Sequence, residues 1–263
     1  MKKLYLHLWM VVVMFFPPAG VAGDVTPDYE REQRISEQIE PDIFDGEAVW
    51  LSDGEREFLS IHIAVDGAKG AVILMHGRDV SPEEQELIGP LRVGLAESGW
   101  TTLALQMPVL EKGKKYYDYL PILPLAHPRI EAAINFLREQ GESKIVLAAH
   151  SCGAHMTNSW LNTNPGVAID GYIAMGLGAT DAGQDLRTPF PIDRISVPVL
   201  DIYGSEEFPR PLSMVDERKQ MLARNGNPLS AQVAVEGANH YFTGYGDRMV
   251  EELSVWLDTL ADQ

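Results

Sequence analysis

The stretch around Ser151 has the residue types of a nucleophilic serine. Residues 145–149 form an apolar run, and Ser151 follows with Gly153 two positions later. A serine hydroxyl becomes a useful nucleophile when a base removes its proton and the backbone lifts it clear of its neighbours. An abrupt turn from strand to helix provides that lift, and it needs small residues two positions before and after the serine, here Ala149 and Gly153. A serine that merely caps a helix is the alternative interpretation.

With this turn, the chain resembles the α/β-hydrolase superfamily over residues 47–262. The commonest pattern has glycine where this chain has Ala149, and a methyl group is tolerated there. The resemblance implies the chain order nucleophile, acid, histidine, with the histidine in the loop after the last strand. His240 occupies that place, between a predicted strand at 233–235 and the final helix. We therefore expect His240 to be the general base for Ser151.

The triad acid is expected just after the preceding strand, where it can orient the imidazole. The turn Gly204-Ser205-Glu206-Glu207 resembles the superfamily's Gly-x-x-Asp turn, with glutamate at the acid position. This favours Glu207, while Glu206 and Asp201 stay open as alternatives. Because glutamate is one methylene longer than aspartate, the loop carrying it has to retract.

An oxyanion hole needs two N–H groups that point at the developing charge. The resemblance implies the backbone amide of Cys152, the residue after the nucleophile, and that of Arg78 in the His76-Gly77-Arg78 stretch, which looks like the superfamily's His-Gly-x motif. The Arg78 guanidinium is interpreted as solvated. His76 is interpreted as structural, with its ring bonded to loop backbone.

Rival chemistries have weaker support. Cys152 lies one residue past the turn, where its side chain is directed into helix packing, so it is interpreted as a small buried hydrophobe. His150, Cys152 and His155 match no recognised zinc spacing. Because no zinc spacing is met, we expect no metal. Glycine-rich phosphate loops are absent from the sequence, so we expect no nucleotide cofactor either.

The elements that position these residues alternate between short apolar runs and helical patterns, as in a sheet covered by helices on both faces. We expect an α/β-hydrolase fold with a mostly parallel central sheet and no large lid. The first two strands should form an antiparallel pair. The expected strands lie at 48–51, 58–65, 71–75, 101–106, 144–149, 171–175, 197–203 and 233–235. The expected helices lie at 84–98, 128–140 and 153–161, with a last helix that buries Val250, Leu253, Trp256, Leu257 and Leu260.

Composition limits the class of protein. The chain has 263 residues, 45% of them hydrophobic, with a net charge of -17. One globular domain fits these numbers, and a nucleic-acid partner is excluded for want of a basic face.

Residues 1–23 read as a signal peptide, 24–46 as an acidic arm that docks on or wraps the domain, and 47–263 as the hydrolase domain. We expect export from a bacterial cell to the periplasm or the medium, without stable membrane insertion after signal cleavage. The single cysteine permits no intramolecular disulfide.

The pocket walls are expected from loops 108–124 and 177–196, which include Phe190. The lysines at 112, 114 and 115 are interpreted as a solvated loop crest and not as an anion site. Segments 200–204 and 239–244, with the export signal, resemble a bacterial family catalogued as a domain of unknown function. The predicted activity is a serine hydrolase that acts on a small-molecule carboxylic ester, with thioester or amide substrates still open. The alternative is a non-catalytic envelope binding or assembly protein that retains the fold.

Overall fold

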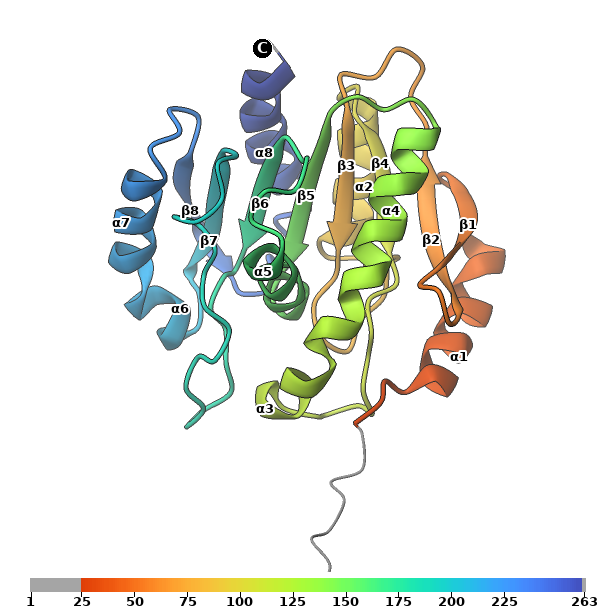
Figure 1. Ribbon diagram of the computed structural model, residues 1–263, viewed down its shortest axis with the longest axis horizontal. Coiled ribbons are helices and arrows are strands. Elements are labelled where there is room, and N and C mark those ends of the chain that lie inside the picture. Colours follow the sequence, from red (N-terminus) through yellow and green to blue (C-terminus); the bar gives the residue numbers. More distant parts are fainter. Residues whose placement is uncertain (1–24, 262–263) are drawn as a thin grey trace, which may run out of the picture.

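An eight-stranded sheet forms the centre of the computed structural model, which describes residues 25–261 (Figure 1). The predicted signal peptide lies outside the described residues. The strand order is β1-β2-β4-β3-β5-β6-β7-β8. The strands are β1 (Glu47–Ser52), β2 (Glu57–Ile63), β3 (Ala71–Met75), β4 (Thr101–Leu105), β5 (Ile145–His150), β6 (Gly171–Met175), β7 (Val199–Glu206) and β8 (Ala231–Asn239).

Strands β3 to β8 pair in parallel, whereas β2 pairs antiparallel with both β1 and β4. Parallel neighbours need crossover connections, and helices supply them on both faces. The five residues of β3 show the result, because all are buried. Ala71, Ile73 and Met75 face one core, and Val72 and Leu74 face the other. The predicted mostly parallel sheet and the antiparallel opening pair are confirmed.

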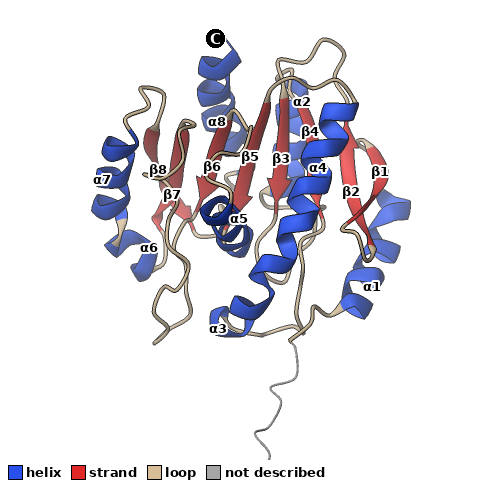
Figure 2. Cartoon of the chain, viewed as in Figure 1, coloured by secondary structure: helices blue, strands red, loops and turns tan. Residues whose placement is uncertain are grey.

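Different helices cover the two faces (Figure 2). Helices α4, α5 and α7 pack over the core that contains Leu137 and Trp160, while α2 and α8 pack over the core that contains Leu91 and Trp256. The α-helices are α1 (Tyr29–Ile39), α2 (Ile88–Glu97), α3 (Tyr116–Tyr119), α4 (His127–Glu139), α5 (Cys152–Thr163), α6 (Pro209–Ser213), α7 (Val215–Asn225) and α8 (Gly246–Ala261). Two short 3-10 helices are η1 (Glu40–Asp42) and η2 (Leu120–Ala126).

Three elements depart most from their expected bounds. The helix predicted from residue 84 begins at Ile88, because the Glu84 carboxylate accepts the N–H groups of Leu87 and Ile88 and so caps the helix from outside. Strand β7 extends to Glu206 and β8 runs from Ala231 to Asn239, since the two pair beyond the apolar run that suggested each of them.

Helix α1, in the acidic arm, was not predicted. It begins after Asp28, whose side chain accepts the Arg31 N–H at 2.9 Å. Glu32 and Ser36 are its buried residues, and the Glu32 carboxylate lies 2.7 Å from the guanidinium of the equally buried Arg129 on α4. A helix that buries polar side chains lacks the apolar stripe by which sequence patterns are recognised.

Within residues 25–261, no helix combines the length and the hydrophobicity that crossing a bilayer requires.

Candidate active site

Three strands end at the same edge of the sheet, and each is followed directly by one of the predicted triad residues. Ser151 follows β5, Glu207 follows β7 and His240 follows β8. The carboxyl ends of parallel strands meet at one edge, so residues far apart in the sequence come together there.

The backbone at Ser151 has the sharp turn expected of a raised nucleophile. Its φ of 52° and ψ of -113° lie outside the regions that non-glycine residues ordinarily adopt. Helix α5 starts at the next residue. A Cβ on Gly153 would lie 2.5 Å from the His76 carbonyl oxygen and 2.7 Å from that of Met75, so only glycine allows α5 to pack this closely on β3.

The three side chains are in contact. Nε2 of His240 lies 2.8 Å from Oγ of Ser151, within a hydrogen bond. Nδ1 of His240 lies 2.7 Å from Oε1 of Glu207. Both His240 and Glu207 are buried. The structure therefore brings together the serine, the histidine and the favoured acid.

The two alternative acids lie elsewhere. Glu206 is exposed at the end of β7. Asp201 is fully buried, but its Oδ2 lies 2.8 Å from Nε of the buried Arg218 on α7. The loop that carries Glu207 was expected to retract. The pairing of β7 with β8 shifts register between Gly204 and Glu206, directly before this residue. A bulge there re-aims the following residue, Glu207, toward the histidine.

Gly176 is a residue of this site that the sequence analysis missed. It follows β6 with a φ of 63°, and a Cβ there would lie 3.1 Å from Oε2 of Glu207 and from both Cε1 and Nδ1 of His240. The place directly after a central strand is the only sequence signal that could have indicated it.

Several aromatic neighbours contact His240. Nε2 of His150 lies 2.9 Å from the His240 carbonyl oxygen. Burial lowers the pKa of His150 to about 3, so its ring is neutral at neutral pH and donates one N–H to that carbonyl. The half-exposed Phe208 stacks on His240 with ring centroids 4.6 Å apart, and the exposed Tyr241 meets the same ring edge-on.

The residues of the predicted oxyanion donors line the same cavity as Ser151. The Cys152 amide is the first of α5, and Arg78 lies in the loop after β3. Within residues 25–261, neither amide has a hydrogen-bond acceptor. The His76 ring contacts loop backbone as expected, with Nδ1 2.7 Å from the Gly77 carbonyl and Nε2 accepting the Met107 N–H at 3.0 Å.

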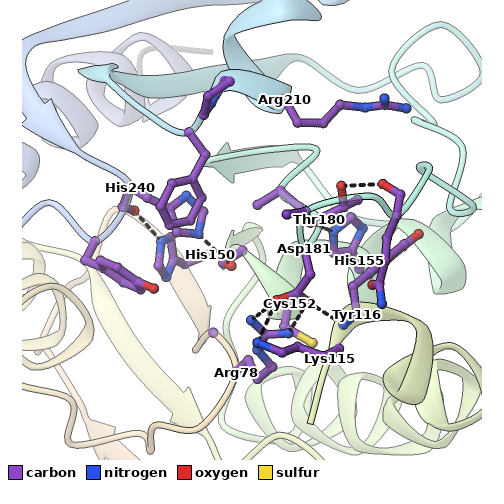
Figure 3. Close-up of a pocket in the computed structure, with 18 of the residues that line it drawn as sticks. Arg78, Lys115, Tyr116, His150, Cys152, His155, Thr180, Asp181, Arg210 and His240 are labelled. Carbon is purple, nitrogen blue, oxygen red and sulfur yellow. Dashed lines mark hydrogen bonds and ion pairs between the residues drawn. The ribbon is translucent and has the colours of Figure 1, made fainter. Parts of the chain in front are cut away.

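The Arg78 guanidinium is not simply solvated, which corrects the expectation. It donates to the two carboxylate oxygens of Asp181 at 2.7 and 3.3 Å. Asp181 also accepts the backbone N–H of Tyr116 at 2.7 Å and lies 3.4 Å from Nζ of Lys115. Figure 3 shows this charged cluster across the pocket from His240.

A cavity of about 760 Å³ opens over these groups. Both expected loops contribute, the first through Lys115 and Tyr116 and the second through residues 179–185. Phe190 does not line it and packs in the core instead. The remaining lining residues are Gly77, Arg78, Val80, Glu84, His150, Ser151, Cys152, His155, Phe208, Pro209, Arg210, His240 and Tyr241.

The residues weighed as metal ligands have other partners. Nε2 of His155 lies 2.7 Å from the Ala179 carbonyl oxygen, and His150 contacts the His240 carbonyl. The Cys152 thiol is buried, which raises its pKa to about 12. In the part of the chain that the structure describes, no group of three or more His, Cys, Asp and Glu side chains is placed to hold a metal ion.

Comparison with known families agrees with the sequence resemblance. Residues 17–117 match a family described as "Protein of unknown function (DUF3530)". Among curated proteins, no sequence matches the chain.

Solved structures share the architecture at low sequence identity. A dienelactone hydrolase from Anabaena variabilis is 17% identical with a TM-score of 0.62, covering 81% of this chain and 96% of its own. Est1E from Butyrivibrio proteoclasticus, solved with ferulic acid bound, is 15% identical with a TM-score of 0.63, covering 82% and 100%. An esterase from Pyrococcus furiosus is 16% identical with a TM-score of 0.62, covering 85% and 93%. The predicted α/β-hydrolase fold is confirmed.

Proposed function

We propose that this protein, with its α/β-hydrolase fold and this arrangement of side chains, is a serine hydrolase that cleaves carboxylic esters of small molecules. One observation carries the proposal: the buried His240 bridges Ser151, at 2.8 Å, and Glu207, at 2.7 Å, below a cavity of about 760 Å³. We propose as well that the protein acts after export to the periplasm or the medium, with residues 1–23 as the signal.

In the acylation step, Ser151 Oγ forms a bond to the ester carbonyl carbon while His240 Nε2 takes the hydroxyl proton. The carbonyl π electrons move to oxygen, and the amides of Arg78 and Cys152 stabilise that oxyanion. Glu207 holds the ring in the tautomer that leaves Nε2 free and stabilises the imidazolium. When the oxyanion collapses, the ester C–O bond breaks and His240 protonates the departing alcohol.

Deacylation repeats these roles with water. His240 removes a proton from a water molecule, the hydroxide attacks the acyl carbon, and Ser151 leaves with the proton that His240 returns. The same constellation serves esters, thioesters and amides, since all pass through a tetrahedral oxyanion. Phe208 and Tyr241 offer apolar aromatic surface at the mouth of the cavity. Substrate preference can be measured with a panel of short and long acyl esters. The panel should include aromatic acyl esters, such as an ester of ferulic acid, the compound bound by Est1E.

A fluorophosphonate probe tests the nucleophile, because it reacts covalently with an activated serine. The purified protein should be labelled, and Ser151→Ala and His240→Ala should not be. Labelling that survives Ser151→Ala would refute the assigned serine. A folded wild type that stays unlabelled, and hydrolyses no ester of the panel, would favour the non-catalytic binding protein.

Glu207→Gln and Glu206→Gln form a matched pair for the acid. The loss of the carboxylate at Glu207 should lower kcat about 100- to 10,000-fold, because the imidazolium is no longer stabilised. The same change at the exposed Glu206 should leave kcat within about twofold of wild type. Equal effects of the two changes would refute the assignment of Glu207.

A further inference from the structure

The loop that carries the proposed oxyanion donor has an unusual backbone. Asp79, directly after Arg78, has a φ of 67°. The left-handed region is uncommon for residues other than glycine, although aspartate tolerates it better than most. Such a conformation persists when surrounding contacts hold it in place.

One of those contacts acts on the donor's own peptide unit. The carbonyl of Gly77 and the N–H of Arg78 belong to the same planar group, so they point in opposite directions. Nδ1 of His76 lies 2.7 Å from that carbonyl oxygen. The N–H of Arg78 is thereby directed away from His76.

The second contact comes from the acidic arm. Nη1 of Arg31 on α1 lies 2.9 Å from Oδ1 of Asp79, and Nη2 donates to the Asp79 carbonyl oxygen at 3.3 Å. Nη1 also donates to the Leu110 carbonyl. The guanidinium is largely buried, with 14% of the side chain exposed, so water screens this ion pair less than a surface pair. Arg31 thus holds both the side chain and the backbone of Asp79.

Helix α1 is itself fixed to the domain. The Asp28 N–H donates to the Val109 carbonyl at 2.7 Å, and the Val109 N–H donates to Glu32 at 3.1 Å. Glu32 also pairs with the buried Arg129, which donates to the Gln106 carbonyl at 3.0 Å. The arm is therefore anchored to the segment after β4, the same segment whose Met107 N–H contacts His76.

We infer that Arg31 is a positioning residue for the oxyanion hole: by holding Asp79 it fixes the direction of the Arg78 amide, so the acidic arm is part of the catalytic apparatus. The inference rests on the proposed function. It assigns a function to the arm, for which the sequence indicated none: the arm positions the loop that carries Arg78.

Arg31→Ala tests this inference, and Arg34→Ala is the matched control. Arg34 lies one turn along the same helix and is exposed, and among residues 25–261 it pairs only with the exposed Glu30, at 3.7 Å. With the best p-nitrophenyl ester, Arg31→Ala should lower kcat about tenfold and leave KM within about twofold, since a small misplacement of a group that acts in the transition state reduces rate and not ground-state binding. Arg34→Ala should match wild type in both constants.

A trifluoromethyl ketone with the same acyl chain gives the readout specific to the oxyanion. Its adduct with Ser151 carries the charge that the Arg78 amide is proposed to stabilise, so its Ki should rise in Arg31→Ala by the same factor as kcat/KM falls. A loss of thermal stability alone would not change Ki in the protein that remains folded. Arg31→Lys should recover part of the loss, because lysine keeps the charge but not the forked donors.

Asp79→Asn covers the case in which Arg31→Ala does not fold. Asparagine tolerates the left-handed backbone but removes the charge that Arg31 contacts. It should lower kcat several-fold and raise Ki in parallel. Wild-type kcat and Ki in Arg31→Ala, or in Asp79→Asn, would overturn the inference, as would a change confined to KM. An unlabelled wild type would refute the proposed function instead, so the two failures are distinguishable.

Discussion

Gly176 is the residue that gives Glu207 and His240 room to meet. Gly176→Ala would place a methyl group 3.1 Å from atoms of both side chains, a contact tight enough that a neighbour has to shift. We expect kcat to fall at least tenfold, because the histidine or the carboxylate has to move out of line. Steady-state kinetics with a p-nitrophenyl ester measures the effect.

Gly67→Ala separates crowding from backbone strain. Gly67 has a similar φ of 68°, but a Cβ there meets nothing within 4 Å. Both substitutions should lower the free energy of unfolding by about 1 kcal/mol through the left-handed backbone. Only Gly176→Ala should lower kcat. A similar loss of activity in both variants would contradict the steric explanation.

At the residue scale, the sequence was informative where a residue has a fixed place in a motif. Ser151, His240 and Glu207 were predicted from local context and chain order, and the structure brings all three into contact. Gly176 and Arg31 were not predicted. Their importance comes from contacts made across the fold, and no local pattern encodes which distant side chain a glycine must leave room for.

At the scale of elements, Asp201 shows how an acid near the expected place can be paired with a different partner. It and Arg218 are both fully buried and join α7 to β7, and Gln232 donates to the same carboxylate oxygen at 2.8 Å. Arg218→Ala should lower the free energy of unfolding by about 3–5 kcal/mol, since it leaves a buried carboxylate without its partner. Urea denaturation measures this loss.

Lys219→Ala is the control on the same helix, because Lys219 is exposed. It should change the free energy of unfolding by less than about 0.5 kcal/mol. Folded Arg218→Ala protein should still react with the fluorophosphonate probe at the wild-type rate. A selective loss of labelling in the folded variant would mean that Asp201 does more than hold α7.

Buried polar side chains such as Arg218 explain which elements could be predicted from the sequence. Strands such as β3 and β5 are continuous apolar runs, and these were assigned almost to the residue. Helices α1 and α7 were missed. Their buried positions include Glu32, Ser36 and Arg218, and a polar side chain that is buried through an ion pair or a hydrogen bond looks like a solvated one in a pattern of apolar residues.

At the scale of the whole molecule, the histidines whose pKa is lowered most by burial make stability depend on pH. Burial lowers the pKa of His150 to about 3 and the pKa of His76 and of His155 to about 4. Above pH 6.5 both folded and unfolded forms are neutral at these sites. Below it the unfolded chain takes up protons that the native protein excludes, so stability falls until the folded sites also protonate. Each histidine should cost about 2 kcal/mol of unfolding free energy by pH 5.

Urea denaturation at pH 7.5 and pH 5, followed by tryptophan fluorescence, measures this dependence. His155→Gln is the informative variant, because it removes one of the rings whose pKa is lowered to about 4. The difference between the two pH values should shrink by about 2 kcal/mol in that variant. An unchanged difference would mean that other groups control the acid sensitivity.

The burial of the Cys152 thiol has a consequence for its reactivity under oxidising conditions, such as those that the proposed export would impose. With the pKa of the thiol raised to about 12, only about one molecule in 100,000 carries the thiolate at pH 7. Alkylating reagents and mixed-disulfide exchange both require that anion. An oxidising environment should therefore leave this sulfur unmodified, although it lies one residue from Ser151.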